Sequence, residues 1–143
     1  DAQNPPQMKT LNDILEECAH ESGFPTYLYA RMGEANVIID HVTQYPALLR
    51  AFTDTVYETQ LATTRRRRMV LYFCDALGAA EPSTSYSVAP IIEKMEDRAF
   101  DFVNGLRGHG IEVDVQSATP FVGELDALMA GLRMGLTITY STC

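Results

Sequence analysis

The stretch DALMAGLRMGLTITY, residues 126–140, alternates between apolar side chains and smaller or more polar ones. From residue 128 on, its even positions are apolar, namely Leu128, Ala130, Leu132, Met134, Leu136, Ile138 and Tyr140. A period of two predicts a β-strand with one face in a core and the other near water. Because such a strand exceeds the usual length, we expect it to bend at Gly131 and Gly135 or to project as an arm. Either way, we expect it to offer a free edge to a second copy of the chain.

Length and composition fit a single domain over residues 8–143, with residues 1–7 as a tag remnant or disordered leader. The chain has 143 residues, 46% of them hydrophobic, which is enough for a core without a metal or a disulfide. The cysteines, Cys18, Cys74 and Cys143, are scattered and odd in number, which favours a reducing compartment over a disulfide framework. No apolar run reaches the ~18 residues that span a membrane, so we expect no membrane partner.

The charge is acidic overall and unevenly distributed, with a net value of −8. Residues 1–64 and residues 69–143 each carry a net −6, whereas Arg65–Arg68 contribute +4. An acidic surface repels nucleic-acid phosphates. We therefore expect DNA to pass this protein without specific binding.

The amino-terminal part predicts a helix over 11–21. Thr10 and Asp13 have the spacing of a capping box, and Gly23 and Pro25 end the helical pattern.

The middle of the chain is rich in strand signals. We expect a short strand or extended lead at 27–29, strands at 47–58, 66–75 and 111–115, and turns near 60–64 and 117–120. The segment 66–75 is apolar on both faces, which predicts a central strand covered on both sides. Residues 33–42 are ambiguous, and we favour a short helix that ends before Pro46.

A second main helix follows a polar loop at 76–87. Ser87 is its expected cap, with Pro90 in the first turn, and Gly108 is its expected end. Its apolar stripe comprises Ile91, Met95, Ala99, Phe102, Val103 and Leu106. Strands joined by short turns favour antiparallel pairing. Together these elements predict an α+β fold, a small mainly antiparallel sheet of four to five strands with two main helices packed on one face.

Side chains suited to chemistry are few. Cys18 and His20 are neighbours, but the other cysteines and histidines lack the spacing of a zinc site, so we expect Cys18 in the core and His20 exposed. Cys74 lies within an apolar strand, where packing is the simpler interpretation. Asp97 and Asp101 are four residues apart on one helix, as on a solvated surface.

No motif of a phosphate-binding loop or a nucleophile elbow is present, and the glycines at 105–110 follow a helix instead of opening one. The residues alone therefore show few signs of an active site, and we expect no catalytic residue, no metal and no cofactor.

The run Arg65–Arg68 allows three interpretations. Successive strand residues alternate sides, so these side chains divide two and two. They are a solvated strand start, a contact with the acidic surface of a neighbouring subunit, or a nucleic-acid patch.

The order of elements over residues 10–140 resembles the small tail-terminator and tail-completion proteins of long-tailed phages and their prophage relatives. The resemblance is carried by Tyr45-Pro46-Ala47 before a strand, the basic-then-apolar run from Arg65 to Asp75, the helix with Phe102-Val103 and Leu106, and the close from Leu125 to Tyr140.

This resemblance implies a structural virion protein that assembles in the host cytoplasm as a homo-oligomeric ring, often a hexamer, at the head-proximal end of the tail. It also implies that the protein is not an enzyme. It implies a protein that stops growth of the tail tube and joins the tail to the head, with a tail-tube protein and a head-completion or connector protein as partners. Arg65, Arg66, Arg67 and Arg68, with the loop 76–87, are the expected contact with a neighbour.

Two other functions remain open at this point. One is a small dimeric α+β enzyme or ligand-binding domain, with a pocket between the second helix and the sheet. The other is a nuclease, which is disfavoured because the acidic residues and the lysines do not fall on one strand.

Overall fold

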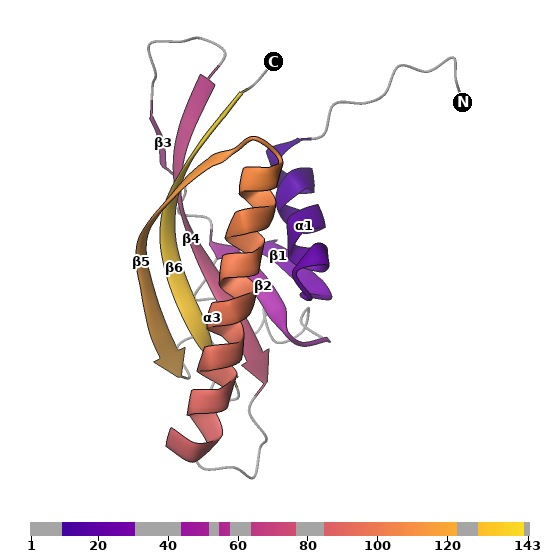
Figure 1. The fold of residues 1–143 in the computed structure, drawn as a ribbon, viewed down its shortest axis with the longest axis vertical. Coiled ribbons are helices and arrows are strands. Elements are labelled where there is room, and N and C mark those ends of the chain that lie inside the picture. Colours follow the sequence, from indigo (N-terminus) through magenta and orange to yellow (C-terminus); the bar gives the residue numbers. More distant parts are fainter. Residues whose placement is uncertain are drawn as a thin grey trace, which may run out of the picture.

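A computed structural model describes most of the chain. The described residues are 10–30, 44–51, 55–57, 64–76, 85–122 and 129–141. Their elements are α1 (Leu11–Glu21), β1 (Thr26–Ala30), β2 (Ala47–Ala51), β3 (Thr55–Tyr57), β4 (Thr64–Ala76), α3 (Ser85–Gly108), β5 (Glu112–Val122) and β6 (Met129–Ser141). The sheet runs β1-β2-β4-β6-β5, and the short β3 pairs with β4 beside this path (Figure 1).

The sheet is mainly antiparallel, as predicted. Only β1 and β2 are parallel among the described strand pairs, and the pairs β2–β4, β3–β4, β4–β6 and β5–β6 are antiparallel. Residues of α1 and α3 share one buried cluster with the sheet, and Figure 1 shows both helices on the same face. The predicted α+β class is therefore confirmed.

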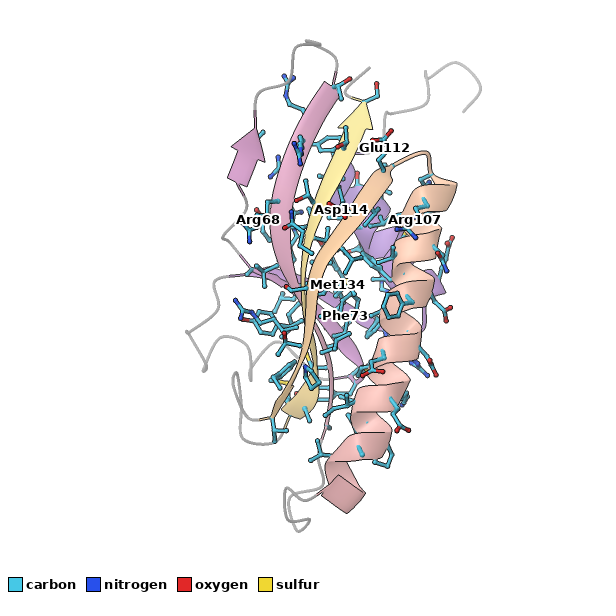
Figure 2. The ribbon with its side chains drawn as sticks, turned by 60° about the vertical axis from the view of Figure 1, so that its left-hand side comes forward. Arg68, Phe73, Arg107, Glu112, Asp114 and Met134 are labelled. Atoms are coloured by element: carbon cyan, nitrogen blue, oxygen red, sulfur yellow. The ribbon has the colours of Figure 1, made fainter. Side chains whose placement is uncertain are left out.

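Alternating residues of the two central strands build the main core. Met69, Leu71 and Phe73 of β4 lie beside Leu132 and Met134 of β6, and all are buried. Figure 2 shows Phe73 and Met134 between the sheet and α3. Each such side chain contributes about 1.5–3 kcal/mol when it leaves water, so the alternation that is visible in the sequence accounts for the attachment of the helices.

The opposite face of the sheet carries a second apolar cluster. It consists of Ala47, Leu49, Ala51, Tyr72, Cys74, Phe121 and Met129. The rings of Tyr72 and Phe121 meet edge to face, with centroids 5.5 Å apart. The segment 66–75 is a central strand with two apolar faces, as predicted. The predicted cover on both sides is seen only on the first face, because neither described helix contributes to this second cluster.

The prediction for the carboxyl-terminal strand is right about the strand itself but wrong about a free edge. β6 pairs with β4 along one side and with β5 along the other. The expectation that β6 offers an edge to a second copy is therefore wrong, because β5 returns antiparallel and occupies that edge. Among the described strands, β5 is the outermost on this side of the sheet.

Both helices end in the same way. In α1, Gly23 has a φ of 91° and the amide of Phe24 donates to the carbonyl of Ala19 at 2.9 Å. In α3, Gly110 has a φ of 81° and the amide of Ile111 donates to the carbonyl of Leu106 at 3.3 Å. This is the Schellman arrangement, in which glycine adopts the left-handed backbone without steric cost. The capping box of Thr10 and Asp13 is also present, as predicted.

Three boundaries differ from the sequence predictions. Helix α3 begins at Ser85, so Ser87 is not its cap and Pro90 lies inside the helix. Residues 117–120 continue β5 after an irregularity between Val115 and Ser117, because an edge strand accommodates a proline and a bulge that suggest a turn in the sequence.

The third difference is the predicted strand 47–58, which is present as the separate strands β2 and β3. The expectations for residues 1–7 and for the helix at 33–42 lie outside the described residues, as do those for most of the tip at 60–64 and of the loop at 76–87.

Candidate functional site

The four arginines lie on β4 and divide between its two faces, as strand alternation predicts. Arg65 and Arg67 share the side of Met69, which packs toward the helices, and Arg66 and Arg68 share the opposite side. Figure 2 shows Arg68 on the side of β4 away from α3. The run is therefore not one continuous patch, and its two halves have different surroundings.

Arg67 contributes to the structure of the sheet. Its Nε donates a hydrogen bond of 3.3 Å to the hydroxyl oxygen of Tyr140, and its side chain is half-buried. Tyr140 in turn packs against the main core. On the other face of β4, Arg66 and Arg68 are both exposed, which makes them the candidates for an intermolecular contact on that face.

The register brings acidic residues to the same level of the sheet. Arg66 pairs with Thr139 of β6, which pairs with Glu112 of β5. One step along, Arg68 pairs with Thr137, which pairs with Asp114. We call Arg66 and Arg68 the basic border, and Glu112 and Asp114 the acidic border. Two strand spacings separate the backbones of the borders, which is about 10 Å.

An open hollow of about 430 Å³ lies between the two borders. Its lining residues are Arg66, Glu112, Val113, Asp114, Thr137 and Thr139. Thr137 at its floor is only 4% exposed. The site is thus a polar depression with positive charge along one side and negative charge along the other.

The acidic border lies on a strand with one open edge. Within the described part of the chain, β5 pairs only with β6. Its second half contains Pro120 and begins after the irregularity at Val115/Ser117, two features that oppose pairing with a further strand. The regular segment is Glu112–Val115, which lies beside the hollow. Arg107 of α3 donates to the carbonyl of Val113 at 3.0 Å and so fastens this segment to the helix.

The two cysteines in the described part of the chain are packed, as predicted. Cys18 and Cys74 are both fully buried. The thiol of Cys74 donates to the carbonyl of Ala47 at 3.4 Å. Burial, and secondarily the charge of Asp75, raises the pKa of the Cys74 thiol far above its ordinary value, which keeps it protonated and unsuited to act as a nucleophile.

Asp75, Asp97 and Asp101 do not form an acidic cluster that could hold a metal ion. Asp75 at the end of β4 forms an ion pair of 3.0 Å with Lys94 of α3, whereas Asp97 and Asp101 are exposed on α3. His20 is exposed, and its Nδ1 lies 3.0 Å from the carbonyl oxygen of Phe24. Among the residues that the structure describes, no group of three or more His, Cys, Asp or Glu side chains could hold a metal ion.

Sequence reasoning missed the acidic border and a buried cation. The alternation Glu-Val-Asp-Val at 112–115 already places both carboxylates on one face, but only the pairing through β6 sets them opposite Arg66 and Arg68. Arg50 is 3% exposed, its guanidinium lies 3.9 Å from the ring centroid of Tyr29, and its Nη1 donates to Oδ1 of Asn12 at 3.3 Å. A lone arginine in a strand carries no signal of such burial.

Comparisons with known proteins do not assign this chain to a family. The sequence matches no family model and no curated protein. Neither described helix is long and apolar enough to cross a membrane.

Proposed function

We propose that this chain is a structural virion protein that forms the ring of a tail terminator or tail-completion protein in a phage or phage-derived particle. In this role, the ring ends growth of the tail tube and joins the tail to the head. Its partners are further copies of itself, a tail-tube protein and a head-completion or connector protein.

The observation that carries the proposal is the edge of the sheet at β5. As far as the structure describes the chain, β5 ends the sheet with an open edge, and such edges are templates for pairing with another chain. A contact between two different patches of identical subunits closes into a ring when the rotation permits it. The resemblance implies a small antiparallel or mixed sheet with helices packed on it, and this chain has that fold.

The charge distribution supports the same role. With a net charge of −8, a ring of this protein repels the phosphates of DNA in its channel, so DNA slides through without being held. The positive charge of Arg66 and Arg68 lies on β4, next to the short strand β3, where it suits contact with an acidic protein surface.

The alternative of an enzyme or ligand-binding domain requires a pocket between the second helix and the sheet. In the described structure, that space is filled by core side chains such as Met95 and Phe102. The hollow on the other face is lined mainly by charged and hydroxyl side chains, whereas small-molecule pockets are mostly apolar. We therefore retain the assembly function.

Sedimentation velocity over a range of concentrations tests the proposal. We expect association at micromolar concentration, weaker at high salt because salt screens contacts between charged surfaces. A protein that sediments as a monomer at high micromolar concentration, both at low salt and in the presence of a tube protein encoded beside its gene, overturns the proposal.

A further inference from the structure

We propose that the acidic border of one copy, Glu112 and Asp114, docks against the basic border of the next copy, Arg66 and Arg68, with β5 lying beside β3. This inference rests on the proposed function, since it names the contact that builds the ring. Its partner is a second copy of this chain in head-to-tail orientation.

The two open edges lie at the same level of the sheet. β3 pairs with β4 at Thr55↔Arg68 and Tyr57↔Arg66, the same two rows that lead through β6 to Asp114 and Glu112. Within the described residues, no strand pairs with the other side of β3 or of β5. At the level of these two rows, β3 is the outer strand on one side of the sheet and β5 is the outer strand on the other. The basic border is the one next to β3, and the acidic border lies on β5.

The strand directions fit without turning a subunit over. β4 and β5 are both antiparallel to β6, so they run in the same direction, and β3 runs against β4. When two copies have the same orientation, β5 of one and β3 of the next are antiparallel. Antiparallel pairing is the commoner kind, and every described strand pair except β1–β2 uses it.

The lengths of the segments also agree. β3 contains three residues, and the regular part of β5 is Glu112–Val115, before the irregularity and Pro120. The carbonyl of Val113 accepts from Arg107, and a carbonyl oxygen has a second lone pair for a neighbour's amide. Pairing between copies is thus confined to the part of β5 that carries the acidic border.

The charges then make the contact directional. In the joined sheet, the acidic border of one copy lies about two strand spacings, or about 10 Å, from the basic border of the next, across β3. Long arginine and glutamate side chains can span much of this gap. If one copy had the reverse orientation, the acidic border would meet the acidic border of its neighbour, or the basic border would meet the basic border. Such contacts between like charges are strongly disfavoured.

Charge reversal on each border tests the inference. The first variant is Glu112→Arg with Asp114→Arg, and the second is Arg66→Glu with Arg68→Glu. Each variant alone presents like charges at the contact, so we expect its association constant to fall at least about tenfold. A mixture restores both contacts, because the new basic border meets the new acidic one and the unchanged borders meet each other. We expect the mixture to assemble within about threefold of the original protein.

Rescue in the mixture distinguishes a contact between copies from a charge effect within one subunit. Within one chain the two borders also face each other across the hollow, and mixing cannot repair a repulsion inside a subunit. The matched control is Glu93→Arg with Asp97→Arg, which makes the same change of charge at two exposed positions of α3. We expect this control to assemble as the original protein does.

The outcomes are distinct. If the original protein assembles and the reversals leave assembly unchanged, or the mixture is not rescued, the contact is wrong while the proposed function stands. If the original protein is monomeric under every condition, the proposed function fails and the contact fails with it. Circular dichroism of each variant verifies that loss of assembly is not loss of the fold.

Discussion

The backbone of Gly131 in β6 lies directly against the carbonyl group of Phe73 in β4. A Cβ atom at Gly131 would overlap the carbonyl oxygen of Phe73 and would lie 2.9 Å from the Cα of Cys74. These neighbours are backbone atoms of the central strand, so they cannot move without disturbing the register of the sheet. The glycine is required by the close approach of two strands.

We therefore expect Gly131→Ala to destabilise the protein by about 1–3 kcal/mol or more, as overpacking does in a dense core. The measurement is urea unfolding followed by circular dichroism. Gly108→Ala is the matched control, because a Cβ there meets nothing within 4 Å and alanine favours a helix. If both variants unfold at the same urea concentration, the two strands do not approach as described.

The buried Arg50 provides a second prediction. Oδ1 of Asn12 accepts from Nη1 of Arg50 at 3.3 Å and from the hydroxyl of Tyr27 at 2.7 Å. Asn12→Ala removes this shared acceptor, and we expect it to lower the free energy of unfolding by about 1–2 kcal/mol. Glu16→Ala, at an exposed position of the same helix, should have a much smaller effect. Equal unfolding curves for the two variants would refute the linking role of Asn12.

The buried thiol of Cys74 predicts a dependence on pH. Because its folded pKa is raised above the ordinary value of 9.0, the folded protein keeps the proton at a pH where the unfolded chain releases it. This contribution to stability is complete below that ordinary value and is lost as the pH rises above it, with a slope approaching about 1.4 kcal/mol per pH unit.

The measurement compares unfolding of the original protein and of Cys74→Ala between about pH 7 and about pH 10, a range that includes the ordinary ionisation of a thiol. The variant lacks the thiol, so its stability should fall less steeply above pH 9. Only the difference in slope matters, because the lost packing lowers the stability of the variant at every pH. Parallel slopes would mean that the thiol is not shielded from water.

The division of the arginines gives a fourth prediction. Arg66→Ser with Arg68→Ser should weaken assembly and make the remaining assembly less sensitive to salt, since the basic border is lost. Arg65→Ser with Arg67→Ser removes the same charge from the other face, together with the hydrogen bond to Tyr140. We expect this pair to lower thermal stability more than it lowers association. If the two double variants weaken association equally, the contact between copies does not depend on the face of β4 that carries Arg66 and Arg68.

Local patterns predicted much of the fold. The alternation around Leu132 and Met134 predicted a core strand, and Thr10 with Asp13 predicted the start of α1. The failures concern pairing, which is not local. Pro120 indicates a turn in the sequence, but it lies in an edge strand, where a missing amide need not interrupt the ladder. The free edge was placed on the last strand because nothing in residues 126–140 reveals that β5 covers it.

In the candidate site too, local features were predicted from the sequence and relations between strands were not. The sequence predicted that Arg65–Arg68 divide between two faces, and they do. It did not predict that Glu112 and Asp114 lie opposite Arg66 and Arg68, because this relation passes through the register of three strands. The role of Arg67 in bonding Tyr140 depends on a contact between residues 73 positions apart.

Native mass spectrometry of the original protein tests the central claim most directly. A closed ring has one defined number of subunits, so the account predicts a single dominant species at an integer multiple of 15.9 kDa, containing three or more copies, with closed circular particles in electron micrographs of the same sample. A monomer at high micromolar concentration, or an open series of masses without a preferred size, would contradict the account.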